Sequence, residues 1–218
     1  METTLCSITG TVTRPFQGIP HVSVTAEINM DACREVVSEL KPRMDSVGYN
    51  SLMIKACAVT LQKFPLLCVT NFISPHDINI SFAVSSPDAL HMPVIRRCQD
   101  LSVAGIGMEA GRLADRCRSG QITPDEMAGG SFSVSNLGMI GVDWFTALIV
   151  PGQTGILAVG TVKERPVVRG GQLAVASTVR VTLTCDHCVV DSAYAASFLS
   201  ELQAVLEKPV KLVMVCPS

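Results

Sequence analysis

Apolar and polar residues alternate along several short stretches of this chain, and the alternation predicts the strands of a sheet. The first clear case is 22–28, where Val22, Val24, Ala26 and Ile28 are separated by polar residues. Four later segments are predicted as strands on similar grounds: 130–135, 154–163, 165–168 and 173–184. The last two are joined by Arg-Gly-Gly-Gln, which predicts a hairpin turn. The second half of the chain is therefore predicted to be mostly strand.

The middle of the chain has two weaker strand patterns. Apolar runs at 67–73 and 78–85 are joined by a short polar connection and predict a second hairpin. The stretch 91–95 contains Pro93, which lacks the N–H that a central strand needs. We therefore expect this stretch at an edge or a bulge.

Helical spacing and capping residues predict four main helices: 32–40, 52–64, 103–118 and 193–207. The second is apolar on nearly all sides and is expected to be buried, with Asn50 or Ser51 as its cap. Ser102 is expected to cap the third. Strands and helices are mixed, and neither an internal repeat nor a linker interrupts them. The pattern predicts one α/β domain.

Composition narrows the possible functions. The chain has 218 residues, of which 48% are hydrophobic, only 17% are charged, and the net charge is −2. A basic surface for nucleic acid or an anionic membrane is therefore not expected, and a surface poor in charge favours an oligomer. No apolar run reaches the roughly 20 residues of a membrane span, and the N-terminus does not resemble a signal peptide, so a cytoplasmic protein is expected. The nine cysteines lack CxxC spacing and are expected to be reduced.

A histidine and a carboxylate follow the last predicted strand. His187 can take up or release a proton near neutral pH, and Asp191 lies four residues later, where it could orient the ring or hold a neighbouring arginine. By spacing alone this is weak evidence, because a histidine beside an apolar run is commonly a structural residue. His187 is the candidate general base.

A second candidate lies in the segment 129–138. Ser131, Ser133 and Ser135 alternate along a predicted strand and share one face. Ser135 stands at its end, where a hydroxyl could donate a hydrogen bond to an oxyanion or could simply tie down a turn. The chain has neither a Gly-x-Ser-x-Gly elbow nor a phosphate loop, and its four histidines are too dispersed to suggest a metal site.

The residues 186–193 read Asp-His-Cys-Val-Val-Asp-Ser-Ala, which resembles the Asp-His-Arg-Val-Val-Asp-Gly-Ala signature of dihydrolipoamide acyltransferase catalytic domains, the core components of 2-oxo acid dehydrogenase complexes. The segments 133–143, 156–160 and 165–168 are similar to further motifs of that family, as are Ile19-Pro20-His21 and shorter matches at 77–80, 86–88 and 93–96. The more distant chloramphenicol acetyltransferases share the fold and the His-x-x-x-Asp pattern. The resemblance covers about residues 19–209.

The resemblance implies a chloramphenicol acetyltransferase-like two-layer sandwich with a mixed sheet, and a homotrimer with active sites between subunits. It implies acetyl-CoA as cosubstrate, His187 as general base, Ser135 as oxyanion donor from the neighbouring subunit, and Asp191 as a residue that holds the site's geometry. His21 lies where the acyl acceptor would be expected to bind. Residues 1–18 are expected to form an N-terminal arm and 19–218 the acyltransferase catalytic domain.

The sequence departs from the family at three points. Cys188 replaces the arginine and Ser192 the glycine of the signature, and the sequence begins where the family's catalytic domain begins, so we expect a protein without a lipoyl domain of its own. Cys188 is expected to be a buried structural residue rather than a nucleophile. Without a covalently bound lipoyl group, the first hypothesis is a free-standing acetyltransferase. It would move an acetyl group to a hydroxyl of a small molecule, for instance a tetronate intermediate of a natural-product pathway.

Two alternatives remain open. The chain could be the dihydrolipoamide acyltransferase core of a 2-oxo acid dehydrogenase complex, served by lipoyl domains on other chains or cut from a longer one. It could instead be a scaffold that has lost catalysis and assembles as a trimer, or as a larger cage through the apolar tail 210–215.

Overall fold

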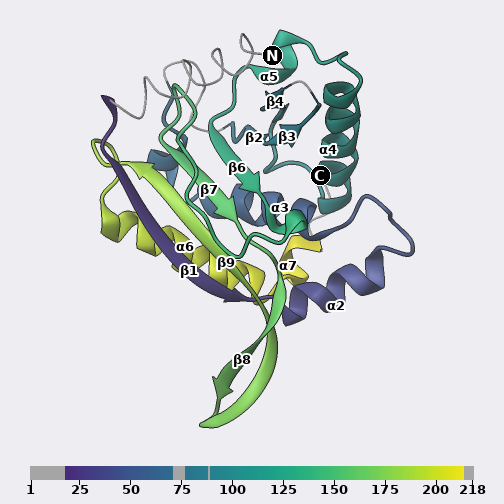
Figure 1. Cartoon of the computed structure of the whole chain (residues 1–218), viewed down its shortest axis with the longest axis vertical. Helices are drawn as coiled ribbons and strands as arrows, with labels where there is room; N and C mark the ends of the chain where they lie inside the picture. Colours follow the sequence, from purple (N-terminus) through teal and green to yellow (C-terminus); the bar gives the residue numbers. More distant parts are fainter. Residues whose placement is uncertain (1–17, 71–76, 88, 214–218) are drawn as a thin grey trace.

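The fold is built on one mixed sheet, as the computed structural model shows for residues 18–70, 77–87 and 89–213 (Figure 1). The sheet has seven strands in the order β1-β9-β7-β6-β2-β5, with β8 paired to β9. Neighbours β7, β6 and β2 run parallel, and the other pairs are antiparallel. The strands are β1 His21–Asn29, β2 Ile80–Phe82, β5 Val94–Ile95, β6 Phe132–Asn136, β7 Gly155–Val159, β8 Lys163–Arg169 and β9 Gln172–Asp186.

The two faces of the sheet differ sharply in chemistry. One row across the strands is apolar and faces the core: half-buried Val24 and buried Leu183, Leu157, Val134 and Phe82. The neighbouring row consists of Thr25, Thr182, Ala158 and Ser135, on the opposite face. The alternation in the sequence therefore separates a face that packs on helices from a face rich in hydroxyl groups.

Helices cover the apolar face and form the second layer. In Figure 1, α3 and α6 lie behind the sheet, and α4 stands beside the short strands β2 and β3. The bounds are α2 Asp31–Leu40, α3 Tyr49–Leu61, α4 Val103–Arg118, α5 Pro124–Met127, α6 Ser192–Leu206 and α7 Val210–Val213. Helix α3 is buried along most of its length and α6 packs Phe198 and Leu202 into the core. In the described part of the chain no helix is long and apolar enough to cross a membrane.

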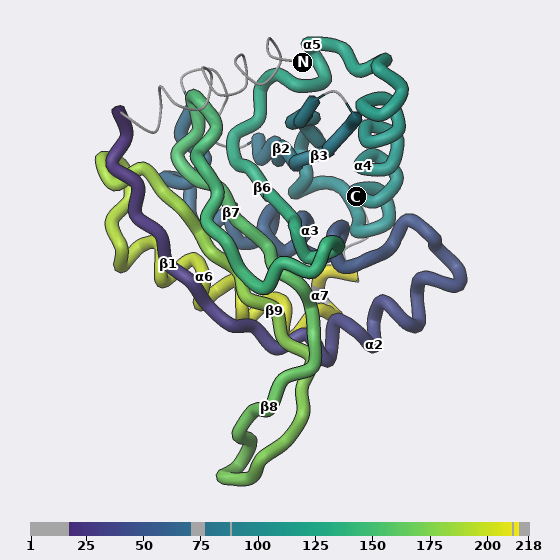
Figure 2. The backbone as a smooth tube through the Cα atoms, in the orientation of Figure 1, coloured from purple at the N-terminus to yellow at the C-terminus, as the bar shows by residue number. Residues whose placement is uncertain are grey.

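A long hairpin projects beyond the body of the protein. Strands β8 and β9 extend past the other strands and turn at Gly170 and Gly171, as the tube in Figure 2 shows. Both glycines have positive φ values of 58° and 81°, which side chains with a Cβ rarely adopt. The predicted turn between the last two strands is confirmed.

Most predicted elements are confirmed, but the hairpin 67–73/78–85 is wrong. Pro65–Cys68 forms a 3-10 helix in which Leu67 and Cys68 are buried, because a proline at its first position favours a turn; residues 71–76 lie outside the described ranges. The segment 78–85 divides into β2 and the short strand β3 Val84–Ser85, which pairs with β4 Leu90–His91. Strand β5 lies at the sheet edge, as Pro93 predicted.

Candidate active site

His187 stands in a tight turn where β9 ends. Its backbone N–H donates to Pro20 O at 2.8 Å, and the N–H of Asp186 donates to Thr154 O at 3.0 Å. The turn closes when Val190 N–H donates to Asp186 O at 2.9 Å, with the Val190 side chain buried. The position of His187 is therefore fixed from both neighbouring strands.

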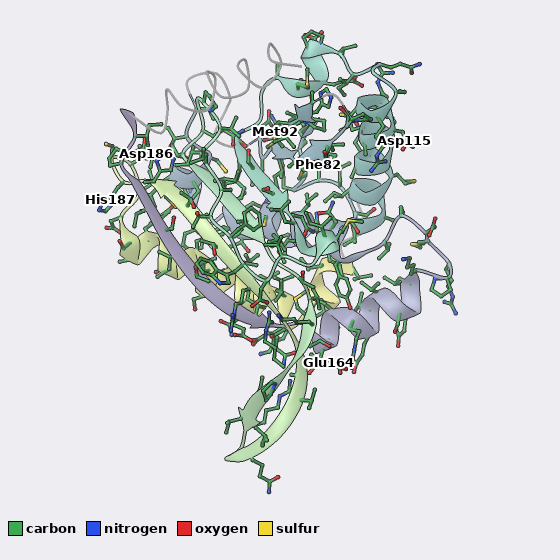
Figure 3. The ribbon with its side chains drawn as sticks, viewed as in Figure 1. Phe82, Met92, Asp115, Glu164, Asp186 and His187 are labelled. Carbon is green, nitrogen blue, oxygen red and sulfur yellow. The ribbon has the colours of Figure 1, made fainter. Side chains whose placement is uncertain are left out.

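The ring of His187 is oriented by its own turn. Nδ1 lies 3.1 Å from the carbonyl oxygen of Val190. A carbonyl only accepts hydrogen bonds, so Nδ1 must carry the proton and Nε2 of the neutral ring keeps its lone pair. The residue is exposed and lies at the sheet end far from Glu164 on β8 (Figure 3). This is the arrangement that a general base needs.

Asp191 lies at the start of α6. Its Oδ1 accepts a hydrogen bond from Tyr194 N at 2.7 Å, which makes it the N-cap of that helix. In the described structure the ring of His187 is held by the Val190 carbonyl, and Asp191 acts on the site through the backbone of the turn.

The three serines of the second candidate segment have different surroundings. Ser131 bonds with the backbone of Asn79, and buried Ser133 bonds with Gln153 and Ser81. Ser135 is half-buried, and within the described residues its hydroxyl has no hydrogen-bond partner. Of the three hydroxyls, that of Ser135 is therefore available to a substrate.

Ser135 and His187 lie at opposite ends of the sheet within one chain. Ser135 is in the row of Ala158 and Thr182, and His187 follows Thr182 by five residues along β9. At about 3.3 Å per residue the two are about 16 Å apart along the strand direction alone. A single chain cannot place both on one reacting group.

His21 lies at the same end of the sheet as His187. It pairs with Asp186 in the register of β1 and β9, so it lies beside the strand end that carries His187. Its Nδ1 bonds to Ile19 O at 2.8 Å, and its Nε2 accepts from Ile149 N at 3.5 Å. His21 thus joins the start of β1 to the long loop between β6 and β7.

The expectation that Cys188 is buried is wrong. It is exposed in the turn, where its N–H donates to Asp186 Oδ1 at 2.9 Å. Partial desolvation and the Asp186 carboxylate raise the pKa of its thiol above the usual value. The protonated thiol is favoured over the nucleophilic thiolate, which argues against a cysteine mechanism.

A cavity of about 600 Å³ opens beside the end of β6. Its walls include Phe82, Val84 and Leu137, and Asn136 lies at its edge next to Ser135. Lys41 and Arg118 contribute positive charge. Sequence analysis singled out only the segment that contains Asn136 and Leu137, because the other cavity residues come from separate segments with no shared motif.

Comparison with known proteins identifies the family. The family described as 2-oxoacid dehydrogenases acyltransferase (catalytic domain) matches residues 4–214. The chain belongs to this family. Members thus share the catalytic domain of an acyltransferase, and the resemblance in the sequence motifs is confirmed.

One curated relative is the mitochondrial dihydrolipoyllysine-residue acetyltransferase component of the pyruvate dehydrogenase complex from Schizosaccharomyces pombe. It is 37% identical over 205 residues, covering 89% of this chain and 42% of the relative. The chain thus spans less than half the length of that family member.

Solved structures of the family superpose over nearly the whole chain. A probable dihydrolipoamide acetyltransferase from Listeria monocytogenes is 30% identical with a TM-score of 0.89, covering 100% of this chain and 97% of that one. The Azotobacter vinelandii dihydrolipoamide acetyltransferase, in which the catalytic roles of a serine, a histidine and an asparagine were investigated, is 26% identical (TM-score 0.91, coverage 97% and 91%). The cubic core of a pyruvate dehydrogenase multienzyme complex aligns with the same values.

The fold expectation is confirmed by a more distant likeness. A chloramphenicol acetyltransferase superposes with a TM-score of 0.53 at 12% identity, covering 88% of this chain and 92% of that one. The chain has the predicted α/β sandwich with a mixed sheet.

Proposed function

We propose that this chain transfers an acetyl group between coenzyme A and the thiol of a dihydrolipoyl group, in a site shared by two copies. One observation carries the proposal. In the Azotobacter vinelandii acetyltransferase the histidine follows the serine by 52 positions and the asparagine follows the histidine by four, and Ser135, His187 and Asp191 have the same separations.

The chemistry follows from the free atoms of the two side chains. Nε2 of His187 takes the proton of the attacking thiol, and the sulfur adds to the thioester carbonyl. The hydroxyl of Ser135 donates a hydrogen bond to the oxyanion of the tetrahedral intermediate. The intermediate then expels the other thiolate, which recovers the proton from His187. The same steps run in both directions because both partners are thiols.

A second copy of the chain supplies the missing half of each site. His187 of one copy must approach Ser135 of another, because about 16 Å of strand separates the two in one chain. Exposed apolar side chains lie on the Ser135 side of the sheet: Met139 and Ile140 shortly after β6, and Val168, Leu173 and Val175 farther out on the projecting hairpin. Such surfaces are typical of subunit interfaces. A homotrimer is the closed assembly that we propose.

A larger cage of trimers is supported mainly by similar structures, and less by the apolar tail 210–215. The cubic core is a property of the pyruvate dehydrogenase structure to which this chain is similar. In the described part of the tail, Leu212 is buried against its own chain and Val210 is exposed. Val210 and Val213 are exposed, so within the described tail both are available for a contact between trimers.

The cavity beside β6 is the site that we propose for coenzyme A. It adjoins the residue after Ser135, so a thioester carbonyl at Ser135 can have its pantetheine arm along the apolar walls. Lys41 and Arg118 can then meet the phosphates. The volume of the cavity, about 600 Å³, is large enough for a good part of the pantetheine arm.

A dihydrolipoyl acceptor has better support than the small-molecule hydroxyl predicted from the sequence. The relatives are acetyltransferase components that act on dihydrolipoyllysine residues. A tetronate or other alcohol finds no support among them. Cys188 and Ser192 leave the backbone of the turn and the capping of α6 intact, so they do not argue for another acceptor.

The experiment that tests the acceptor measures release of free coenzyme A from acetyl-CoA, with dihydrolipoamide and a panel of small alcohols in competition. We expect dihydrolipoamide to be preferred. Preference for an alcohol would restore the first hypothesis of the sequence analysis, and silence with every acceptor in a folded trimer would favour a scaffold.

The shared site is tested by mixing two inactive variants, Ser135→Ala and His187→Ala, and reassembling the trimers. A site between copies regains activity in about a quarter of the positions of a random mixture, since one copy supplies serine and the next supplies histidine. A site within one chain regains none.

A further inference from the structure

A cluster of charged side chains lies where β8, β9 and β1 meet, and its centre is Asp143. Oδ1 of Asp143 accepts from Lys163 at 2.9 Å and from Arg165, and Oδ2 accepts from Arg180 at 3.0 Å. Arg180 also reaches Glu27 at 3.2 Å. Three cations thus converge on two carboxylates, and Asp143 contacts all three. We call these five residues the Asp143 cluster.

Asp143 ends the segment 137–143, which begins where β6 ends, two residues after Ser135. Along this segment Leu137 N–H donates to Val159 O at 3.1 Å, and the carbonyls of Gly138 and Val142 both accept from the hydroxyl of Thr161, at 2.9 and 3.0 Å. The segment is thus held against residues 159–161 by a few hydrogen bonds.

The segment 137–143 and residue 160 approach closely at two glycines. A Cβ on Gly138 would lie 2.5 Å from Gly160 O, and a Cβ on Gly160 would lie 2.0 Å from Asp143 O. The backbone of 137–143 therefore lies directly against Gly160, the residue that follows β7. Its outer residues Met139 and Ile140 are 92% and 75% exposed, so they contribute little to holding it.

The charged contacts of Asp143 are a second link between this segment and the sheet, beside the hydrogen bonds of its backbone. Arg165 is only 10% exposed and also donates to Thr178 O at 2.9 Å, so its guanidinium is a fixed anchor. Neutralising Asp143 would leave three neighbouring cations facing the segment with only Glu27 to balance them. The segment would then move away from the cluster.

We propose that Asp143 is a positioning residue for Ser135, acting through the segment 137–143. The inference rests on the proposed function, because it assumes that Ser135 donates to the oxyanion. The hydroxyl of Ser135 has no partner among the described residues, so its place relative to a substrate is set by the backbone that carries it. A misplacement of about 1 Å can cost about a hundredfold in rate.

A double-mutant cycle tests the proposal with the full chain as an assembled trimer. Asp143→Asn keeps the shape of the side chain and removes its charge. We expect it to lower kcat about tenfold or more in the wild-type background, and less than about twofold in a Ser135→Ala background, because the group that it positions is then absent. A general structural role would lower both backgrounds equally and would overturn the proposal.

Hydrogen exchange provides a readout that does not depend on activity. The amides of Leu137 and Thr161 are protected by the bonds that hold the segment, and both should exchange faster in Asp143→Asn. Unchanged exchange at these amides would contradict the proposal whatever the rates.

Glu126→Gln is the matched control. Glu126 also accepts from two arginines, Arg112 at 2.9 Å and Arg116 at 3.0 Å, but it lies on α5 at the end of the molecule away from β8 (Figure 1). The Glu126→Gln variant should have the kcat of wild type and the same amide exchange at residues 137 and 161. A loss of kcat equal to that of Asp143→Asn would overturn the proposal. If Ser135→Ala itself has the wild-type rate, the proposed function fails; if only Asp143→Asn does, the positioning inference fails alone.

Discussion

Nδ1 of His187 is held 3.1 Å from the carbonyl oxygen of Val190, three residues along the same turn. The ring is thus oriented by its own backbone, and in the described ranges no carboxylate bonds to it. His187→Ala should therefore lower kcat by about a hundredfold to ten-thousandfold, the usual contribution of a general base. Glu164→Ala is the control, because Glu164 pairs with Arg34 and lies on β8, far from His187 (Figure 3). Wild-type turnover in His187→Ala would refute the mechanism.

Asp191 is predicted to matter as a cap and not as a charge. Asparagine caps a helix as well as aspartate does, so Asp191→Asn should retain both the free energy of unfolding and kcat. Asp191→Ala removes the acceptor for Tyr194 N and should lower the free energy of unfolding by about 0.5–2 kcal/mol. Urea unfolding measures the first effect. A large loss of kcat in Asp191→Asn alone would show that the charge itself is used.

The positive charges of the cavity are expected to act on binding of coenzyme A. Lys41→Ala and Arg118→Ala should each raise KM for acetyl-CoA several-fold with kcat retained, and the effect should shrink as salt screens the phosphates. Lys63→Ala is the control, because Lys63 pairs with Glu201 on α6 and is not a cavity residue. Equal KM values in all three variants would place coenzyme A elsewhere.

Alanine substitutions at two glycines of helix α4 should change the free energy of unfolding in opposite directions. A Cβ on Gly107 would lie 1.9 Å from Ser46 O, so Gly107→Ala should destabilise the fold by about 1–3 kcal/mol. A Cβ on Gly111 would meet nothing within 4 Å, so Gly111→Ala should stabilise it by about 0.5–1 kcal/mol through the helix propensity of alanine. Thermal or urea unfolding of the two variants checks both signs. A stabilised Gly107→Ala would show that α4 does not pack as described.

Acid should weaken the fold through its ion pairs. The backbone N–H of Thr123 and the guanidinium of Arg112 lower the pKa of Glu126 from 4.5 to about 2. A carboxyl whose pKa is lower in the folded state stabilises the fold above its unfolded pKa, and this contribution is lost as the pH falls through the folded value. The loss should therefore occur between about pH 4.5 and pH 2. The free energy of unfolding of Glu126→Gln should fall less steeply in that range than that of wild type, and parallel curves would contradict the assignment.

The Asp143 cluster should also contribute to the fall of the free energy of unfolding in acid. A hydrogen bond from Thr178 and the charge of Arg180 lower the pKa of Glu27, and Lys163 and Arg165 lower that of Asp143. By the same sign, both stabilise the folded state at neutral pH and lose this effect in acid. Hydrogen exchange at Leu137 should therefore accelerate below about pH 4 more than its intrinsic rate predicts.

The local pattern of the sequence determined the elements that have a strong period and clear end signals. Ser102 and the spacing after it predicted α4, and Gly170 and Gly171 predicted the hairpin turn, because caps and turns depend on a few neighbouring residues. The run 67–73 misled for the opposite reason. An apolar stretch fits a strand or a buried turn equally well, and Pro65 decided for the turn only within the packed core.

The sequence by itself also determined the family and the candidate residues, because the motifs around Ser135 and His187 are contiguous. Only the tertiary structure showed that these two residues lie at opposite ends of one sheet, since that depends on the register of β6, β7 and β9. Only it showed that Ser133 is bonded while the hydroxyl of Ser135 has no partner among the described residues, and that Asp143 meets cations from β8 and β9. Residues that lie far apart in the sequence leave no local pattern of their contacts. These contacts depend on how the strands pair, which only the tertiary structure shows.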